Sequence, residues 1–180
     1  RANVTAQMAG LHVPVEPRRR PTYVFDAATP LDRDLPLTID PSGAHMRTEG
    51  RYYLCGYPPE HDPVAAFDDF EMDHDVCEEK LRPILANRVP AFEAIKVVNS
   101  WMGHYAYNTL DQNAIVGAHP EVQNFAFANG FSGHGYQQSP AMGRGVSENV
   151  TYGEFRELDL FPLGFERILR NDPLLEKAII

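Results

Sequence analysis

The last third of the sequence contains a short apolar run, a glycine-rich loop and a helix-forming segment in direct succession. The apolar run is residues 124–128, the loop is residues 130–135, and Ser139 followed by Pro140 is typical of a helix start. The expected helix presents three apolar side chains on one face: Met142, Val146 and Val150. Because glycine permits positive φ and close approach, this order brings backbone amides and a helix amino terminus against a ligand carrying negative charge. A glycine-rich turn is structural more often than not, however, and the spacing differs from the GxGxxG nucleotide fingerprint.

The preceding part of the chain has the pattern of an antiparallel sheet. A β-branched and aromatic run at residues 22–25 predicts a strand. Residues 44–48 and 52–57 flank a Glu-Gly turn, which predicts a hairpin. Strand character returns at residues 96–98 and 101–107, and short strands at regular spacing favour an antiparallel arrangement.

Two further helices are expected. Residues 1–11 are typical of the end of a helix that stops at Gly10, with Val4, Met8 and Leu11 on one face. Asp75 followed by Glu78 resembles a capping box, and Pro83 should kink the helix that it begins. The apolar stripe of this helix consists of Cys77, Leu81, Ile84 and Leu85.

Composition indicates a folded protein and argues against several classes of partner. Of the 180 residues, 43 % are hydrophobic, and the formal net charge of −9 disfavours nucleic acid or anionic membrane as a partner. No apolar stretch approaches the ~20 residues that span a bilayer, and no signal peptide follows Arg1. The missing initial methionine suggests a processed or truncated chain. Cys55 and Cys77 are isolated, which favours free thiols in a reducing compartment over a disulfide framework or a zinc site.

Two charged segments have competing interpretations. Residues 60–75 are rich in Asp and Glu and could suggest a metal site, but a solvated linker with a helix cap explains them without ligand geometry. The basic run Arg18–Arg20 is interpreted as a solvated strand entry, because three residues are a small binding patch.

Residues 129–135, Asn-Gly-Phe-Ser-Gly-His-Gly, closely resemble the GFSGHG signature of the sarcosine oxidase group of flavoproteins. Residues 108–111 and 115–117 resemble that group's T-P-D…P-I-I-G segment. The chain is thereby identified as similar to the D-amino-acid oxidase and sarcosine oxidase family. Residues 14–18, 88–93 and 179–180 resemble a branch with bacterial members and with mitochondrial members linked to complex I assembly.

The resemblance implies an α+β fold. It consists of an antiparallel substrate-domain sheet with flanking helices, plus the last strand and helix of a Rossmann-like FAD domain. The implied organisation is the end of a helix at residues 1–12, a substrate domain at 13–108, a return to the FAD domain at 109–151 and a carboxy-terminal tail at 152–180. The family's GxGxxG unit, with the adenine and pyrophosphate site, lies outside this chain, so a missing amino-terminal FAD-binding segment is one expected partner.

The resemblance also implies the site. FAD, expected to be non-covalently bound, would contact a set of loop and helix residues: Gly130, Phe131, Ser132, Gly133, Gly135, Tyr136 and Gln137. His134 corresponds to an active-site histidine, whose other interpretation is a hydrogen-bonded loop residue. His104, Tyr105 and Tyr107 are expected in the substrate pocket, with His104 on the opposite face of its strand from the tyrosines. No metal ligand set is predicted.

The expected reaction is hydride transfer from the carbon of a C–N bond in an amine or amino-acid substrate to flavin. The related oxidases carry a lysine at the position of Gln137 and another on a strand that matches residues 52–57, which has no lysine here. This difference favours a dehydrogenase over an oxidase. The alternative is a non-enzymatic, flavoprotein-like assembly factor or interaction module. The expected compartment is the bacterial cytoplasm or the mitochondrial matrix.

Overall fold

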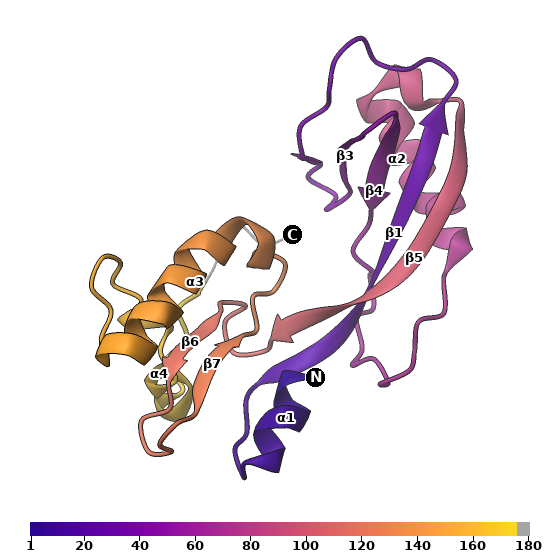
Figure 1. Cartoon of the computed structure of the whole chain (residues 1–180). Helices are drawn as coiled ribbons and strands as arrows, with labels where there is room; N and C mark the ends of the chain where they lie inside the picture. The colour runs from indigo at the N-terminus through magenta and orange to yellow at the C-terminus, as the bar shows by residue number, and fades with distance from the viewer. Residues whose placement is uncertain (176–180) are drawn as a thin grey trace. The chain divides into compact units, whose positions relative to one another are not determined.

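The computed structural model describes residues 1–175 (Figure 1). The chain divides into two compact units. Residues 18–104 form one of them, called the sheet unit. Of the described residues, 1–17 and 105–175 form the other, called the loop unit. The strands β1 (Val15–Ala27) and β5 (Ile95–Asn108) each begin in one unit and end in the other.

An antiparallel sheet in the order β2-β3-β4-β1-β5 confirms the predicted fold class. The other strands are β2 (Thr38–Ile39), β3 (His45–Glu49) and β4 (Tyr52–Gly56). The pairing of Glu49 with Tyr52 closes the predicted hairpin. The strand predicted at residues 22–25 is the last part of a 13-residue strand, and the stretches 96–98 and 101–107 are one 14-residue strand.

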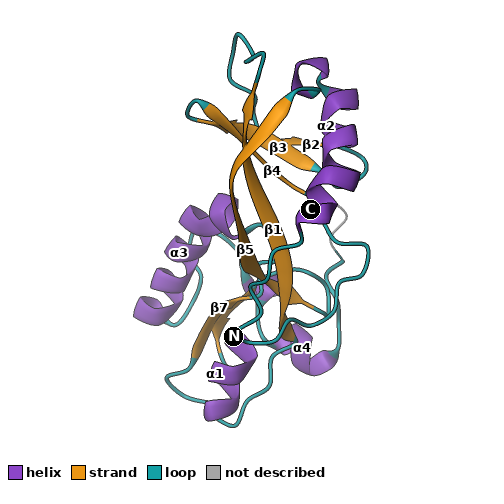
Figure 2. Ribbon diagram, turned by 90° about the vertical axis from the view of Figure 1, so that its right-hand side faces the viewer, coloured by secondary structure: helices purple, strands orange, loops and turns teal. Residues whose placement is uncertain are grey.

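Helices cover one side of this sheet, and the core lies beneath them (Figure 2). The segment η1 (Val76–Leu81) has π-helical geometry, and α2 (Arg82–Arg88) and η2 (Pro90–Phe92) follow it. Alternation along β1 buries Tyr23 and Phe25. The Phe25 ring meets Phe92 edge-on at 5.1 Å between centroids. The expected stripe is confirmed, with Cys77, Leu81 and Leu85 fully buried and Ile84 partly buried against the same core.

The predicted capping box at Asp75 is wrong. Asp75 makes no capping bond, and instead the Asp73 Oδ1 atom accepts hydrogen bonds from the N–H groups of Asp75 and Val76, at 3.2 and 3.3 Å. Asp73 can accept them because it precedes the first turn, where N–H groups have no helical acceptor. Pro83 lies in the first turn of α2, directly after the π-helical segment, where a missing N–H group costs little.

Most of residues 60–75 are exposed, as expected for a linker, but two of the acidic side chains pair with the arginine run. Arg20 holds Asp62 through two parallel hydrogen bonds of 2.8 Å. Arg19 forms an ion pair with Asp69 at 3.1 Å and donates to the Glu71 carbonyl oxygen at 2.7 Å. The two charged segments therefore pair with each other, which neither interpretation included.

The loop unit contains a short helix, a two-stranded sheet and three later helices. The helix α1 (Ala2–Met8) confirms the predicted amino-terminal helix, and Gly10 follows it with φ +74°. Its expected apolar face is wrong for Val4 and Met8, which are exposed, whereas Leu11 is partly buried and Ala6 is buried. The remaining elements are β6 (Ile115–Ala118), β7 (Ala126–Asn129), α3 (Gly135–Tyr152), η3 (Phe161–Leu163) and α4 (Glu166–Arg170).

The helix α3 begins at Gly135, four residues before the predicted cap at Ser139. Pro140 is consequently inside the helix and has no N–H group for the Tyr136 carbonyl oxygen. The Ser139 hydroxyl donates to that oxygen at 2.8 Å, which replaces the missing bond. The predicted apolar face is correct for Met142, but Val150 is 70 % exposed.

The chain after α3, up to residue 175, is part of the loop unit. Leu160 and Phe165 are buried there. Residues 179–180, which contributed to the family resemblance, lie outside the described residues. In residues 1–175, no helix has both the length and the apolar character to cross a bilayer.

Candidate functional site

The candidate site is the loop between β7 and α3, and its backbone is unusual. Gly130 and Gly133 have φ of +68° and +90°, and Ser132 between them has φ +43°. Positive φ is uncommon for a residue with a side chain, and the strain of such positions is of order 1–3 kcal/mol. Strained backbone clusters at functional sites, because the surrounding structure must hold it in place. The loop therefore has a shape that neighbouring residues impose.

Ser132 is held by the end of β5. Its N–H group donates to the Ala106 carbonyl oxygen at 3.1 Å, and its hydroxyl oxygen accepts from the N–H group of Asn108 at 3.0 Å. The residue is only 1 % exposed. Because the hydroxyl group is engaged within the protein, the cofactor contact predicted for Ser132 would have to come from its backbone.

The two positive-φ glycines also lie where a side chain has no room. A β-carbon at Gly130 would be 2.9 Å from Val15 Cγ2, and one at Gly133 would be 2.9 Å from Tyr105 Cε2. Contacts that short do not occur between real carbon atoms without a shift. Gly135 differs, since its β-carbon would meet Phe131 at an ordinary 3.4 Å. A side chain would therefore strain the loop at Gly130 and Gly133 but not at Gly135.

The start of α3 presents amides that have no acceptor within the helix. The first intrahelical hydrogen bond runs from the Gln138 N–H group to the His134 carbonyl oxygen at 3.0 Å. The N–H groups of Gly135, Tyr136 and Gln137 therefore have no carbonyl acceptor within the helix, and the helix dipole adds positive potential there. Tyr136 is 92 % exposed, and Gln137 is exposed as well. These groups suit the electron-rich edge of a ring such as flavin.

Of the other predicted site residues, three belong to the loop unit, namely His134, Tyr105 and Tyr107, and His104 belongs to the sheet unit. His134 occupies the N-cap position of α3, and its N–H group donates to the Phe131 carbonyl oxygen at 2.9 Å. The rings of Tyr105 and Tyr107 lie 6.3 Å apart, and the Tyr105 hydroxyl group donates to the Ser132 carbonyl oxygen. The structure therefore brings both tyrosines to one face of β5 and attaches Tyr105 to the glycine loop.

His104 contacts the acidic segment of the sheet unit. Its Nε2 atom lies 2.7 Å from the Asp69 carbonyl oxygen, and its ring stacks on Phe70 with centroids 4.2 Å apart. A ring nitrogen that already has a hydrogen-bond partner is less available for a covalent flavin link.

Sequence reasoning did not identify a buried polar group beside the loop. Asp111 and Arg167 form an ion pair at 2.7 Å, and Asn108 donates to Asp111 at 3.0 Å. Asp111 lies in the segment that carried the family resemblance. Arg167 gave no signal, because its partner is 56 residues away in the sequence.

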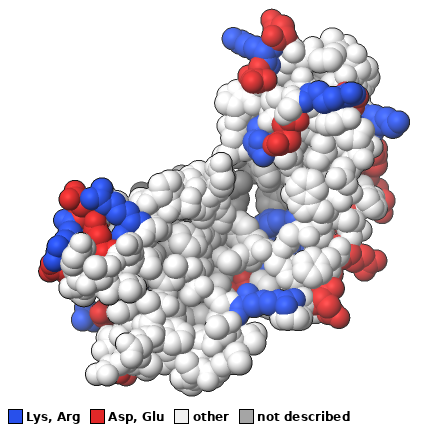
Figure 3. Space-filling view, in the orientation of Figure 1, with Lys and Arg blue, Asp and Glu red and all other residues white. Residues whose placement is uncertain are grey.

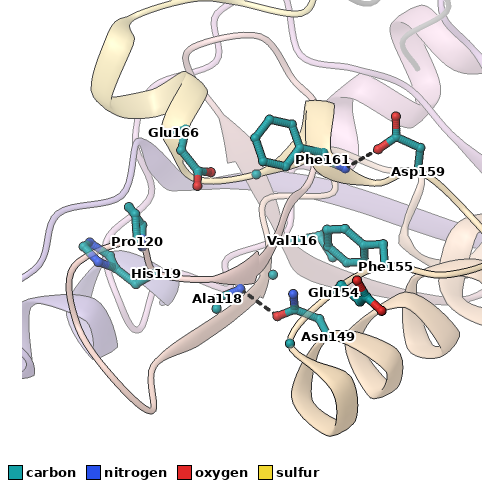
Figure 4. Close-up of a pocket in the computed structure, with 13 residues that line it drawn as sticks. Val116, Ala118, His119, Pro120, Asn149, Glu154, Phe155, Asp159, Phe161 and Glu166 are labelled. Carbon is teal, nitrogen blue, oxygen red and sulfur yellow. Dashed lines mark hydrogen bonds between the residues drawn. The ribbon is translucent and has the colours of Figure 1, made fainter.

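A separate hollow of about 400 Å³ opens beside β6 (Figure 4). Asn149 from α3 accepts a hydrogen bond from the N–H group of Ala118 at 3.0 Å, and Asp159 accepts from that of Phe161 at 3.1 Å. None of the predicted site residues lines this hollow. Figure 3 shows a patch of mixed positive and negative side chains at the left of the view. In α3 and the segment after it, Arg144 pairs with Glu148 and Glu157, and Arg156 pairs with Glu154.

The comparisons with known proteins identify the family. The model of the FAD dependent oxidoreductase family, DAO, matches residues 2–149. FAD-dependent oxidoreductase domain-containing protein 1 of Xenopus laevis is 47 % identical over 175 residues, which cover 96 % of this chain and 35 % of that protein. The Drosophila melanogaster homolog is 38 % identical over 168 residues, which cover 91 % of this chain and 32 % of that protein. The chain spans about a third of the length of these curated relatives.

Solved structures share the fold. L-proline dehydrogenase from P. horikoshii superposes with a TM-score of 0.82 at 24 % identity, over 97 % of this chain and 46 % of that one. Glycine oxidase from Geobacillus kaustophilus gives a TM-score of 0.72 at 22 % identity, over 88 % of this chain and 41 % of that one. Together with the family match, which covers well over half of the sequence, these findings show that the chain belongs to the DAO family of FAD-dependent oxidoreductases.

Proposed function

We propose that this chain is the carboxy-terminal part of an FAD-dependent oxidoreductase that acts on amines or amino acids. The observation that carries the proposal is the geometry of the glycine loop. Two glycines without room for a side chain and a strained Ser132 lead directly into three helix amides with no helical acceptor. The loop is therefore preorganised, which is what stabilisation of developing charge requires.

The amides of Gly135, Tyr136 and Gln137 would hold the flavin at its N1–C2=O edge. When bound, FAD would accept the hydride from the carbon of the substrate's C–N bond, which makes this edge more negative. The dipole of α3 would stabilise that charge, while the neutral side chain of Gln137 would add a hydrogen bond but no positive charge. The adenine and pyrophosphate groups would be held by a segment outside this chain.

The substrate side would be formed by His134, Tyr105 and Tyr107. The imidazole of His134 could polarise a substrate carboxylate or orient the amine, and the tyrosine rings would supply apolar contact with a polar tip. The solved structures with this fold include enzymes named for L-proline and for glycine, which favours a small secondary or primary amino acid. The lack of lysine in residues 52–57 favours a dehydrogenase, and the hydrogen-bonded His104 favours non-covalent FAD.

The second candidate is a flavoprotein-like assembly factor. It is supported by Gln137, which leaves the flavin edge without the lysine of the oxidases. Either role would fit a mitochondrial matrix protein or its bacterial cytoplasmic counterpart.

The test uses the full-length protein loaded with FAD under anaerobic conditions. Proline, glycine, iminodiacetate and a fructosyl amine are added in turn, and bleaching of the flavin's visible absorption is measured. A substrate should bleach it, and air should restore the absorption slowly if the protein is a dehydrogenase. His134→Gln should retain FAD but bleach more slowly. If dithionite reduces the flavin while no amine does, the assembly role is supported and the enzymatic proposal is rejected.

A further inference from the structure

We propose that the buried ion pair of Asp111 and Arg167 is a positioning device for the glycine loop, acting through Asn108 and Ser132. This inference rests on the proposed function of the loop as a flavin site. All four residues belong to the loop unit.

The ion pair is fully enclosed and fully bonded. The Asp111 side chain is 0 % exposed and that of Arg167 is 7 % exposed. Arg167 Nε lies 2.7 Å from Asp111 Oδ2, and Nη2 lies 3.2 Å from Oδ1, which is the bidentate geometry of a strong pair. The remaining donors reach four carbonyl oxygens at 2.7–3.1 Å: those of Leu163, Gly164, Asn113 and Ala114.

Asp111 joins segments that are distant in the sequence. Its Oδ1 atom accepts from Asn108 Nδ2 at 3.0 Å and from the N–H group of Asn113 at 3.1 Å. Its Oδ2 atom accepts from the N–H group of Leu174 at 3.1 Å. The carboxylate therefore fixes the end of β5, the following turn and the chain after α4 to one another.

Asn108 transmits this constraint to the loop. Its side chain donates to Asp111, while its backbone N–H group donates to the Ser132 hydroxyl oxygen at 3.0 Å. Asn108 is completely buried, and its Cβ atom lies 3.3 Å from where a β-carbon of Gly130 would be. A movement of Asn108 would thus change both ends of the strained segment from Gly130 to Ser132.

Fold stability alone is a poor explanation for such a pair. Desolvation offsets most of the attraction between buried charges, and well-packed apolar residues are often equally stabilising. What a fully satisfied polar network does supply is one defined arrangement. Ser132 requires such an arrangement, because its positive φ is held only by its neighbours.

The experiment is a double-mutant cycle in the full-length protein. Arg167→Lys keeps the charge but loses the planar fork, and Ser132→Ala removes only the hydroxyl group. The dissociation constant of FAD, the flavin reduction potential and the apoprotein melting temperature are measured for each variant. Arg144→Gln is the matched control, because Arg144 pairs with Glu148 and Glu157 and has no link to the loop.

If the pair acts through Ser132, each single variant should weaken FAD binding and shift the potential of the bound flavin. In the double variant, the loss of FAD affinity should be smaller than the product of the two single losses by about threefold or more. A difference of this size is within the range for coupled neighbours. A lower melting temperature with unchanged FAD affinity and potential would reject the positioning role. Should Arg167→Lys fail to fold, unchanged FAD binding in Ser132→Ala rejects it equally. Wild-type protein that binds no FAD would instead reject the proposed function.

Discussion

The phenolic hydroxyl group of Tyr105 donates a hydrogen bond to the Ser132 carbonyl oxygen, and the same ring lies against Gly133. β5 therefore determines the shape of a loop that follows it by more than twenty residues. Two glycines of the signature, Gly133 and Gly135, have different roles in this arrangement, because only Gly133 has a positive φ and faces the ring. That difference permits a paired test of the loop's function.

Gly133→Ala should destabilise the protein by about 1 kcal/mol or more, because it combines a positive φ with a 2.9 Å contact to Tyr105. Gly135→Ala should leave stability nearly unchanged, because its β-carbon has ordinary room and its backbone is helical. If the flavin approaches the amides of α3 closely, Gly135→Ala should nevertheless lower FAD occupancy in the full-length protein. The measurements are FAD content at saturating cofactor and apoprotein melting temperature.

Tyr105→Phe is a useful companion to this pair. It keeps the ring against Gly133 and removes only the hydrogen bond to Ser132, so it reports on the hydroxyl group alone. Full FAD occupancy in Gly135→Ala would mean that the flavin lies farther from α3 than proposed.

Gln137→Lys should raise the flavin reduction potential of the full-length protein. Gln137 is exposed at the start of α3, so the added ammonium group would be near the negative charge that reduction places on the flavin edge. Potentiometry measures the effect, and Gln138→Lys is the neighbouring control. A potential that is unchanged or lower in Gln137→Lys would mean that residue 137 does not face the flavin.

The sequence predicted those parts of the fold that depend on local patterns. The Glu49-Gly50 turn between two strand-like segments identified the β3–β4 hairpin, and the apolar stripe identified the helix containing Leu81 and Leu85. The start of α3 was misplaced because Ser139-Pro140 is a strong local signal. The Ser139 hydroxyl group in fact replaces the helix hydrogen bond that Pro140 cannot donate. This role depends on the position at which the helix begins.

The missed parts depend on contacts between distant residues. Nothing local indicates that Arg20 pairs with Asp62, or that Arg167 pairs with Asp111. The glycine loop was found through its resemblance to a family signature. The strained Ser132 is held by a hydrogen bond from the end of β5, which is distant in the sequence and therefore not predictable from local patterns.

The isolated chain should bind FAD poorly. The α3 amides contact only the flavin ring in the proposed site, and the chain covers about a third of its relatives' length. Fluorescence titration of the chain and of the full-length protein under the same conditions compares the two affinities. Equal affinity would show that the adenine and pyrophosphate groups are also held by this chain.

Cys55 and Cys77 should be free but unreactive in the native protein. Both are buried in the sheet unit, and burial raises the pKa of each thiol, so the nucleophilic thiolate is scarce. Alkylation followed by mass spectrometry should label neither residue before unfolding and both afterwards, without a reductant. A protein two hydrogens lighter that resists labelling after unfolding would instead contain a disulfide.

Asp40 should contribute to stability in a pH-dependent way. Its carboxylate accepts from the Ser42 N–H group at 2.9 Å and from Arg88 Nε at 2.8 Å. The Ser42 amide, followed by Arg88, lowers the Asp40 pKa from 3.8 to about 2. Because the folded state binds the proton more weakly than the unfolded state, this stabilisation is complete above pH 3.8 and is lost as the pH falls toward 2.

Asp40→Asn should therefore be less stable than wild type at neutral pH, and the difference should shrink as the pH falls from 3.8 toward 2. Denaturant unfolding at a series of pH values measures this in the full-length protein. The control Asp26→Asn removes an exposed ion pair with Arg51 and should have little effect. A difference between Asp40→Asn and wild type that is constant across the window would show that the Asp40 charge is not responsible.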